Sequence, residues 1–375
     1  MRSPVREIFK RVDLSQIYSF AGGYPSAETF PLEVFEKLAG EVLHKYGAKA
    51  LQYGATQGVP ELRRAVSERY DVPVENIQIT TSSQQGIDVC TRVLVDPGDV
   101  VLVSCPTYLG ALQSFKSYRA EVVGVDLTPS FEASKRRLEQ IDALVAAGKK
   151  IKFFYVIPDF QNPSGETLTL AQRSELVSLA RRYNFLIVED SPYRELRYSG
   201  EPVSTIYSLA PERTLHLGSF SKIMAPGFRL GWIIGAPELL DMIYVCKQSL
   251  DLCPPMPDQY MAAEFMAGGE LDRNLAKSVE LYRGKRDLML SLLEKYMPEG
   301  VSWTHPEGGL FLFLTLPEGY DTVALYDRAL DAGVAYVAGS FFYADGSHRN
   351  TMRLNFSFLA TDRMEPGIKL LASLL

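Results

Sequence analysis

Cysteine and histidine are scarce in this chain. Only four of its 375 residues are cysteine and four are histidine, and no two cysteines form a Cys-x-x-Cys pair. This spacing gives neither a disulfide framework nor a zinc site, so we expect no metal and a reducing compartment, the cytoplasm. The cysteines are Cys90, Cys105, Cys246 and Cys253, and the histidines are His44, His216, His305 and His348.

The chain also lacks long hydrophobic runs and an excess of positive charge. No apolar run is long enough to cross a membrane, and the first 20 residues hold no apolar stretch of the kind found in signal peptides. A net charge of -6 leaves no basic surface of the sort that nucleic-acid binding requires. We therefore expect neither a membrane nor a nucleic acid as a partner.

What is present indicates an α/β protein with two domains. The length exceeds that of one small core, and 46% hydrophobic with 22% charged residues is typical of a folded protein. Between residues 75 and 235, short β-branched runs alternate with amphipathic segments such as 170–183, which Thr169 could cap. This alternation predicts a large doubly wound domain with a mostly parallel sheet. The expected buried strands are 100–103, 151–157, 185–188 and 214–217.

The last third of the sequence has a different pattern. A long charged helix is expected over 269–296, followed by a strand pair at 301–303 and 309–314, a helix over 322–332 and a strand over 351–358. We assign this α+β part to a smaller domain. The expected limits are 1–45 for an N-terminal arm and part of the small domain, 46–258 for the large domain and 259–375 for the small one, with 253–257 as linker.

Lys222 is the most informative residue. It lies in the run Ser219-Phe220-Ser221-Lys222, which continues to Arg229 past a glycine. Hydroxyls and a planar guanidinium suit phosphate oxygens, and a partly desolvated lysine amine is uncharged often enough to act as a nucleophile. The run therefore fits a lysine that forms an imine with a phosphorylated aldehyde, although alone it could equally be a basic surface loop.

Reactive groups follow each of the four expected strands. The strand ends deliver Tyr108, then Asn162, then Asp190 with Tyr193, and finally Lys222. Taken singly, these residues could be a packed aromatic ring, a turn and a helix cap. Because ligands of open α/β sheets bind at the carboxyl ends of the strands, their coincidence favours one shared site.

A second anion-binding feature precedes these strands. The segment 79–86 reads as a strand end that enters a helix, where free amides beside Ser83 and Gln84 would attract a negative group. The alternative is a plain N-cap at Ser82 or Ser83. That alternative would leave the second phosphate-suited cluster at Ser219, Ser221 and Arg229 unexplained.

Seven blocks, in order along nearly the whole chain, resemble the class I and II aminotransferases of fold type I, which are pyridoxal 5'-phosphate enzymes. The likeness is greatest to the 2-aminoadipate and kynurenine aminotransferase group. The blocks are SFAGGYP (19–25), LQYG with GVPELR (51–54 and 58–63), TSSQQ (81–85), QNPSG (161–165), EDSPY (189–193), SFSKIMAPGFRLG (219–231) and NTMRL (350–354).

The resemblance implies catalytic roles for three residues. Lys222 matches the imine-forming lysine, which in this family also moves the proton between Cα and the cofactor C4' carbon. Asp190 matches the carboxylate that pairs with the pyridine nitrogen and keeps it protonated. Tyr193, together with Asn162, matches groups that hydrogen-bond the ring oxygen, and Tyr108 matches the aromatic ring that stacks on the cofactor.

The resemblance also implies how the ligands are held. The phosphate would be bound by Ser83, Gln84, Ser219, Ser221 and Arg229, and by Tyr53 of the partner subunit, so the active unit would be a homodimer. Arg353 matches the arginine that clamps the substrate α-carboxylate, assisted by Asn162 and the backbone at Gly23. Tyr24 stands where this group often has leucine, in a stretch that contributes to side-chain selection.

The expected activity is a ping-pong transamination from an L-amino acid of the 2-aminoadipate, aromatic or branched-chain type to a 2-oxo acid, with 2-oxoglutarate as acceptor. Other outcomes remain open, because the same cofactor also supports lyases, decarboxylases and C–C bond-forming enzymes. A non-catalytic aminotransferase-like domain of a transcription regulator is the third possibility.

Overall fold

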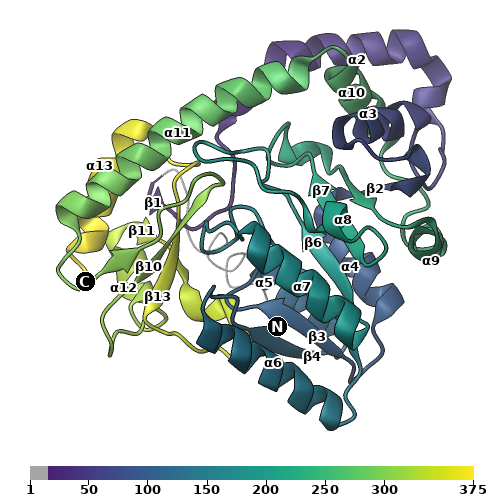
Figure 1. Ribbon diagram of the computed structural model, residues 1–375. Coiled ribbons are helices and arrows are strands. Elements are labelled where there is room, and N and C mark those ends of the chain that lie inside the picture. Colours follow the sequence, from purple (N-terminus) through teal and green to yellow (C-terminus); the bar gives the residue numbers. More distant parts are fainter. Residues whose placement is uncertain (1–15) are drawn as a thin grey trace.

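The computed structural model describes residues 16–375, and their centre is a seven-stranded sheet (Figure 1). The strand order is β2-β8-β7-β6-β5-β3-β4, and all pairs are parallel except the two made by β8. The strands are β2 (Ile77–Thr80), β3 (Val100–Ser104), β4 (Glu121–Val125), β5 (Ile151–Val156), β6 (Leu186–Asp190), β7 (Thr214–Ser219) and β8 (Gly231–Ile234).

Helices cover both faces of this sheet, as expected for a doubly wound fold. One face carries α4 (Ser82–Leu94), α5 (Leu109–Ser117) and α9 (Pro237–Leu250). The other carries α6 (Phe131–Ala146), α7 (Leu170–Tyr183) and the short α8 (Ile206–Leu209), with α6 and α7 on the near side in Figure 1. Strands buried on both faces explain the continuous apolar runs in the sequence.

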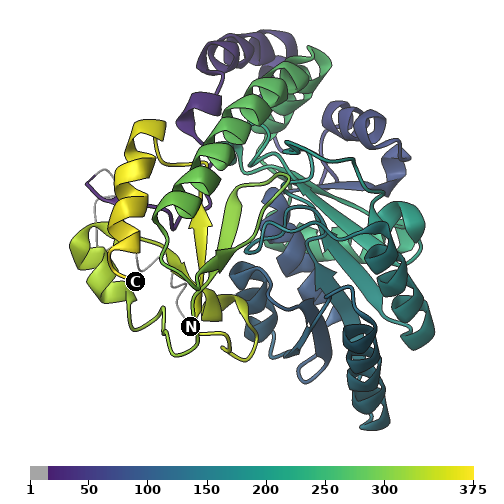
Figure 2. The ribbon, with the colours of Figure 1, turned by 60° about the vertical axis from the view of Figure 1, so that its left-hand side comes forward.

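A smaller antiparallel sheet lies beside the large one. Its order is β12-β13-β10-β9, and α11 and α13 pack together against it (Figure 2). The elements are α11 (Glu270–Tyr296), β9 (Ser302–Trp303), β10 (Phe311–Thr315), α12 (Tyr326–Ala332), β11 (Val334–Ala335), β12 (Val337–Ala338), β13 (Thr351–Asn355) and α13 (Thr361–Ala372).

The N-terminal segment runs between the two sheets. Strand β1 (Tyr18–Ser19) pairs in parallel with β11, and the chain then passes Gly23 and Tyr24 before it enters α2 (Leu32–Tyr46). Helix α2 packs on α10 (Met256–Ala267), which also contacts α3 (Pro60–Tyr70). The N-terminal segment reaches the carboxyl ends of the large sheet at Gly23, whose carbonyl accepts a hydrogen bond from Lys222.

Most expected elements lie where the sequence placed them. Helix α7 begins after Thr169, whose hydroxyl accepts a hydrogen bond from the Gln172 amide, while the Thr169 amide donates to the Gln172 side chain in a capping box. Helix α12 begins at Tyr326, four residues later than expected. Residues 256 and 257, assigned to a linker, instead form the first turn of α10, where proline is tolerated. The domain limits themselves stay a prediction.

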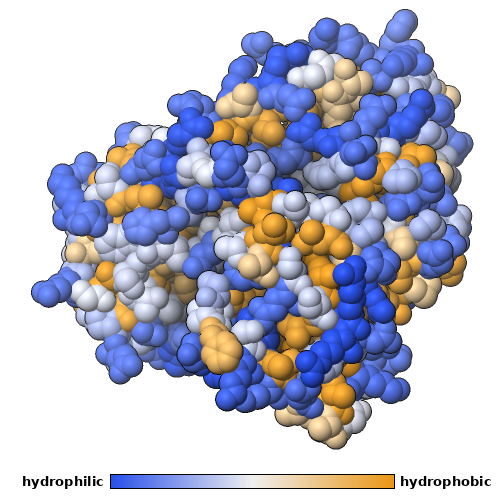
Figure 3. Space-filling model, viewed as in Figure 1, coloured by the Kyte–Doolittle hydropathy of each residue, from blue (hydrophilic) through white to orange (hydrophobic). Residues whose placement is uncertain are grey.

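No helix within residues 16–375 is long and apolar enough to cross a membrane. On the face drawn in Figure 3, hydrophobic residues are interspersed with hydrophilic ones.

Candidate active site

A cavity of about 460 Å³ opens at the carboxyl ends of the central parallel strands β3, β5, β6 and β7. These four strands are neighbours in the sheet, so the groups that follow them converge, as the sequence predicted. Of the expected site residues, thirteen line this cavity: Gly23, Tyr24, Ser83, Gln84, Tyr108, Asn162, Asp190, Tyr193, Ser219, Ser221, Lys222, Arg229 and Arg353. Tyr53 does not, and its side chain is exposed.

Lys222 extends from the loop after β7. Its Nζ donates a hydrogen bond of 2.7 Å to the carbonyl of Gly23 in the N-terminal segment. Burial, together with the nearby guanidinium groups of Arg229 and Arg353, lowers the lysine pKa to about 8. The amine is therefore uncharged far more often near neutral pH than an ordinary lysine, and both a nucleophile and a proton acceptor require the uncharged form.

Asp190 ends β6 and is almost fully buried. Its Oδ2 accepts a hydrogen bond of 2.7 Å from the hydroxyl of Tyr155 in β5, whereas its Oδ1 is buried without a partner among the described residues. Burial raises the pKa of this carboxyl to about 6, against the opposing effects of Tyr155 and of His216. A buried carboxylate with one unsatisfied oxygen calls for a cationic hydrogen-bond donor on the cavity side.

Asn162 and Tyr193 lie together on the wall of the cavity. The Asn162 amide nitrogen is 3.4 Å from the Tyr193 hydroxyl, and both side chains are buried. Burial raises the pKa of Tyr193, so this hydroxyl stays protonated and can donate a hydrogen bond. After the neighbouring strand β3, the Tyr108 hydroxyl donates to the Gln84 side chain over 3.1 Å.

The start of α4 forms one end of the cavity. Thr81, not Ser82 or Ser83, is the N-cap, and its side chain makes no capping bond, so the plain N-cap alternative is wrong. Arg229 donates to Ser82 Oγ over 2.6 Å, and both residues have left-handed backbone conformations that are uncommon outside glycine. First-turn amides, hydroxyls and a guanidinium thus meet in an anion-binding corner.

Glycine at position 231 permits this close approach of β8 to α4. A Cβ atom there would lie 2.6 Å from the carbonyl oxygen of Gly218 and 2.8 Å from the backbone of Ser82 and Ser83. Such distances are not tolerated without displacement, so any larger residue would push the start of α4 away from the strand.

Arg353 projects from β13 into the cavity and is buried. Its guanidinium donates to Asn162 Oδ1 over 2.7 Å and to the carbonyl of Ala21 over 2.5 Å, and it stacks 4.2 Å from the ring centre of Phe311. The expected help of the Gly23 backbone in binding the α-carboxylate stays a prediction; in the structure the Gly23 carbonyl accepts the hydrogen bond of Lys222. Burial lowers the arginine pKa to about 10, which leaves it charged at neutral pH.

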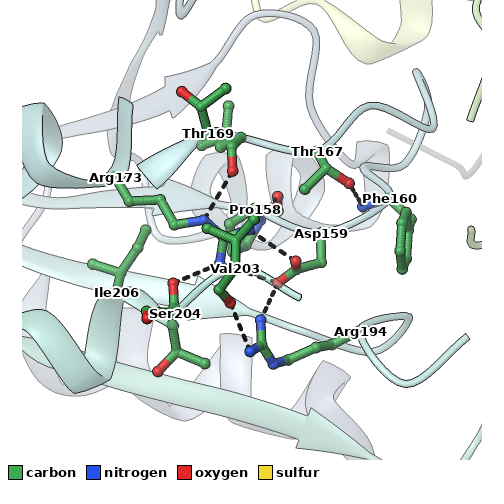
Figure 4. A network of polar contacts seen from close by, with 12 residues as sticks. Pro158, Asp159, Phe160, Thr167, Thr169, Arg173, Arg194, Val203, Ser204 and Ile206 are labelled. Atoms are coloured by element: carbon green, nitrogen blue, oxygen red, sulfur yellow. Dashed lines mark hydrogen bonds and ion pairs between the residues drawn. The ribbon is translucent and has the colours of Figure 1, made fainter. Parts of the chain in front are cut away.

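An ion cluster at Asp159 anchors the loop that carries Asn162 (Figure 4). Asp159 is buried, and its carboxylate accepts hydrogen bonds of 2.8 Å from Arg173 in α7 and 2.9 Å from Arg194. Figure 4 shows the carboxylate between the two arginine side chains. Because both partners come from other elements, the cluster fixes the path of the chain between β5 and Asn162.

The charge of the cavity indicates its ligand. Within residues 16–375, three cationic side chains, Lys222, Arg229 and Arg353, line it together with one carboxylate, Asp190. A buried cation without a countercharge is costly, so this wall suits a ligand that brings two anionic groups. A larger cavity, of about 760 Å³, lies at Arg69 and Glu195, but those charges already pair with each other.

Comparisons with known proteins agree with this site. A family model described as aminotransferase class I and II matches residues 21–369. The chain belongs to this family. It is 46% identical, over 99% of its length and 90% of the other chain, to aromatic-amino-acid aminotransferase 1 of Thermococcus litoralis. It is 36% identical, over 98% and 92%, to a 2-aminoadipate transaminase of Thermus thermophilus.

A solved structure gives the same answer at the level of the fold. The kynurenine aminotransferase of Pyrococcus horikoshii, in complex with PMP, kynurenine as substrate and KYA as product, superposes with a TM-score of 0.95. It shares 44% sequence identity, and the match covers 100% of this chain and 94% of that one. This protein is thus an aminotransferase of fold type I that uses pyridoxal 5'-phosphate.

The residues present fit this cofactor. The corner at α4 suits its phosphate, Lys222 suits its aldehyde carbon, and the unpaired Oδ1 of Asp190 suits the protonated nitrogen of its pyridine ring. Arg353 is left for a second anion, such as the carboxylate of an amino acid.

Three residues in and around the site escaped the sequence analysis. Tyr155, Ala21 and Ser82 each bond a site residue directly. Ser82 could have been found, since it belongs to the helix start that was singled out. Tyr155 and Ala21 lie inside an apolar strand and a glycine-containing segment, where the sequence gives no polar signal.

Proposed function

We propose that this aminotransferase takes its amino group from an amino acid with an aromatic side chain. The observation that carries the proposal is the apolar part of the cavity lining, which includes Tyr24, Tyr108 and Leu109. The ring of Tyr24 also packs 5.6 Å from that of Phe358. Aromatic side chains bury large apolar areas and prefer tilted or offset ring contacts, which such a wall provides.

The charges of the described lining leave a second carboxylate to be bound by the N-terminal arm or by the partner subunit, so the aromatic wall, and not the charge, favours the aromatic donors. Within the described residues that line the cavity, Arg229 belongs to the phosphate corner, Arg353 faces the α-carboxylate and Lys222 is the reacting amine. None of these cations remains for a second carboxylate on the substrate side chain. Arg6 and Arg11 of the N-terminal arm are candidates for that task, and both lie outside the described residues.

We further propose 2-oxoglutarate as the amino acceptor. Its second carboxylate needs a cation as well, and that cation would come from the N-terminal arm or from the partner subunit. An acceptor with one carboxylate, such as pyruvate, serves as the comparison in the assay.

We propose that three residues carry out the proton chemistry. Lys222 moves a proton from Cα of the amino acid to the C4' position, and its lowered pKa suits both halves of this transfer. Asp190 holds the pyridine nitrogen in its protonated form, and Tyr193 donates a hydrogen bond to the ring oxygen. When bound, pyridoxal 5'-phosphate supplies the ring that takes up the electron pair left at Cα.

The test is a panel of amino donors, each with 2-oxoglutarate. Phenylalanine, tyrosine and tryptophan should give the highest kcat/KM, followed by leucine, and 2-aminoadipate the lowest. A kcat/KM for 2-aminoadipate above those of the aromatic donors would overturn the proposal. Formation of glutamate in step with the 2-oxo acid separates transamination from lyase or decarboxylase chemistry.

We also propose that the active unit is a homodimer in which Tyr53 of the partner subunit reaches the phosphate. Tyr53 is 78% exposed and its neighbour Leu51 is 72% exposed, an unusual state for such large apolar side chains. The loop that carries them packs at Gly54 against Met256 of α10. Together these side chains form an apolar surface suited to a second copy.

Subunit complementation tests this assembly. In a mixture of Lys222→Ala and Tyr53→Ala chains, a heterodimer contains one site with both Lys222 and Tyr53 of the partner subunit intact. Mixing two weakly active variants should therefore restore activity. If the mixture stays as inactive as its components, Tyr53 does not act across the interface.

We place the enzyme in the reducing cytoplasm. All four cysteines are free, so the fold uses no disulfide between them. Cell fractionation with an antibody against the chain tests this assignment.

A further inference from the structure

The carboxylate of Asp190 is bonded on one side only. Tyr155 donates a hydrogen bond of 2.7 Å to Oδ2, while Oδ1 is buried without a partner among the described residues. Asp190 lines the cavity, whereas Tyr155 lies behind it and is fully buried. The two oxygens of one carboxylate thus face different surroundings, protein on one side and the ligand space on the other.

The register of the sheet explains how Tyr155 reaches this position. Strands β5 and β6 are parallel, and Tyr155 lies opposite Val188. Because side chains alternate along a strand, Tyr155, Val188 and Asp190 project from the same face of the sheet. The phenol is long enough to span the diagonal to Asp190, and an edge contact of 5.4 Å with Phe115 of α5 limits its movement.

We propose that Tyr155 is a positioning residue of the reaction. Its hydroxyl donates a hydrogen bond to Oδ2 of Asp190 and thereby orients Oδ1 toward the pyridine nitrogen. This inference rests on the proposed pairing of Asp190 with that nitrogen. A hydrogen bond donated to a carboxylate favours its ionised form, so Tyr155 also opposes the protonation that burial promotes. Orientation and charge of Asp190 then both depend on a residue that does not contact the ligand.

A purely structural role predicts something different. Any buried tyrosine needs an acceptor for its hydroxyl, and Asp190 would be a convenient one. In that case, loss of the hydroxyl would disturb the site in a way that does not depend on the cofactor nitrogen. A cofactor analogue that lacks this nitrogen distinguishes the two roles.

The experiment measures the affinity of apoenzyme for two ligands, pyridoxal 5'-phosphate and its 1-deaza analogue, in which a C–H group replaces the pyridine nitrogen. Tyr155→Phe should weaken binding of pyridoxal 5'-phosphate by about tenfold, the usual effect of a lost hydrogen bond to a charged group. Binding of the analogue should change by less than about twofold, because only the nitrogen senses the oriented Oδ1.

Tyr336→Phe is the matched control. Tyr336 is as deeply buried, and its hydroxyl donates a bond of 2.7 Å to the carbonyl of Thr322, away from the cavity. It should leave both affinities unchanged. Circular dichroism on each apoenzyme checks that the variants are folded before the affinities are compared.

Two results overturn the inference. The first is an equal loss for both ligands in Tyr155→Phe, and the second is no loss for either. Asp190→Asn, measured in parallel, separates this failure from failure of the proposed pairing. If Asp190→Asn also binds the two ligands with unchanged preference, the pairing itself is wrong; if only Tyr155→Phe does so, Asp190 acts without help from Tyr155.

Discussion

Replacing Arg353 by methionine gives the sharpest test of substrate binding. The methionine side chain can fill the space beside Phe311 and Phe342, which contact the guanidinium at 4.2 and 5.1 Å, while the charge is removed. If Arg353 clamps the α-carboxylate, the variant buries that anion without a partner. Loss of one member of a buried charge pair costs about 3 kcal/mol, or about 150-fold in kcat/KM.

The assay is the first half-reaction under single-turnover conditions, followed by the absorbance of the bound cofactor. Phenylalanine and phenethylamine are compared as donors, because they share the ring and differ in the carboxylate. For Arg353→Met, the kcat/KM should fall by about 150-fold with phenylalanine and little with phenethylamine. Arg353→Lys keeps the charge without the bidentate fork and should fall in between. Equal losses with both donors would refute the clamp.

Three further outcomes follow from the structure. Burial lowers the pKa of Lys222 from 10.5 to about 8, so the native state loses stability as pH falls from about 10.5 through 8. Lys222→Met should therefore raise the melting temperature of apoenzyme at pH 7, and this increase should become smaller above pH 8. Asp159→Asn leaves buried Arg173 without its countercharge and should cost about 3 kcal/mol in urea unfolding, whereas exposed Glu212→Gln should cost below about 0.5 kcal/mol. Gly231→Ala should weaken cofactor affinity about tenfold or more in apoenzyme titrations, since the added Cβ displaces the start of α4.

The fold and the centre of the site could be predicted because the relevant signals are local. Helix α7 has its cap and its reciprocal Gln172 bond within four residues, and its apolar period within its own 14 residues. Lys222 and Asp190 each follow an apolar run, and neighbouring parallel strands bring such positions to one edge. These signals can be read from the sequence without knowing how distant segments pack.

Other features depend on contacts between distant segments, which no periodicity reveals. The start of α12 shows this. The Asp321 carboxylate accepts the amides of Val323 and Ala324, as an N-cap residue does, and the Leu325 amide donates to the Asp321 carbonyl, so a turn forms where the helix was expected. The Thr322 hydroxyl donates to the carbonyls of Arg349 and Thr351, and the regular helix begins only at Tyr326.

Strand β6 shows how a residue outside the cavity can decide what lies inside it. Glu189 precedes Asp190, so the two carboxylates project from opposite faces of the sheet. Glu189 is fully buried, accepts the amides of Ile206 and Tyr207 at the start of α8, and lies 3.1 Å from His216 Nδ1. A slip of one residue would break all three contacts and turn a longer carboxylate toward the cofactor. The contacts of Glu189, on the face opposite to that of Asp190, therefore fix the register of β6, and this register places Asp190 in the cavity.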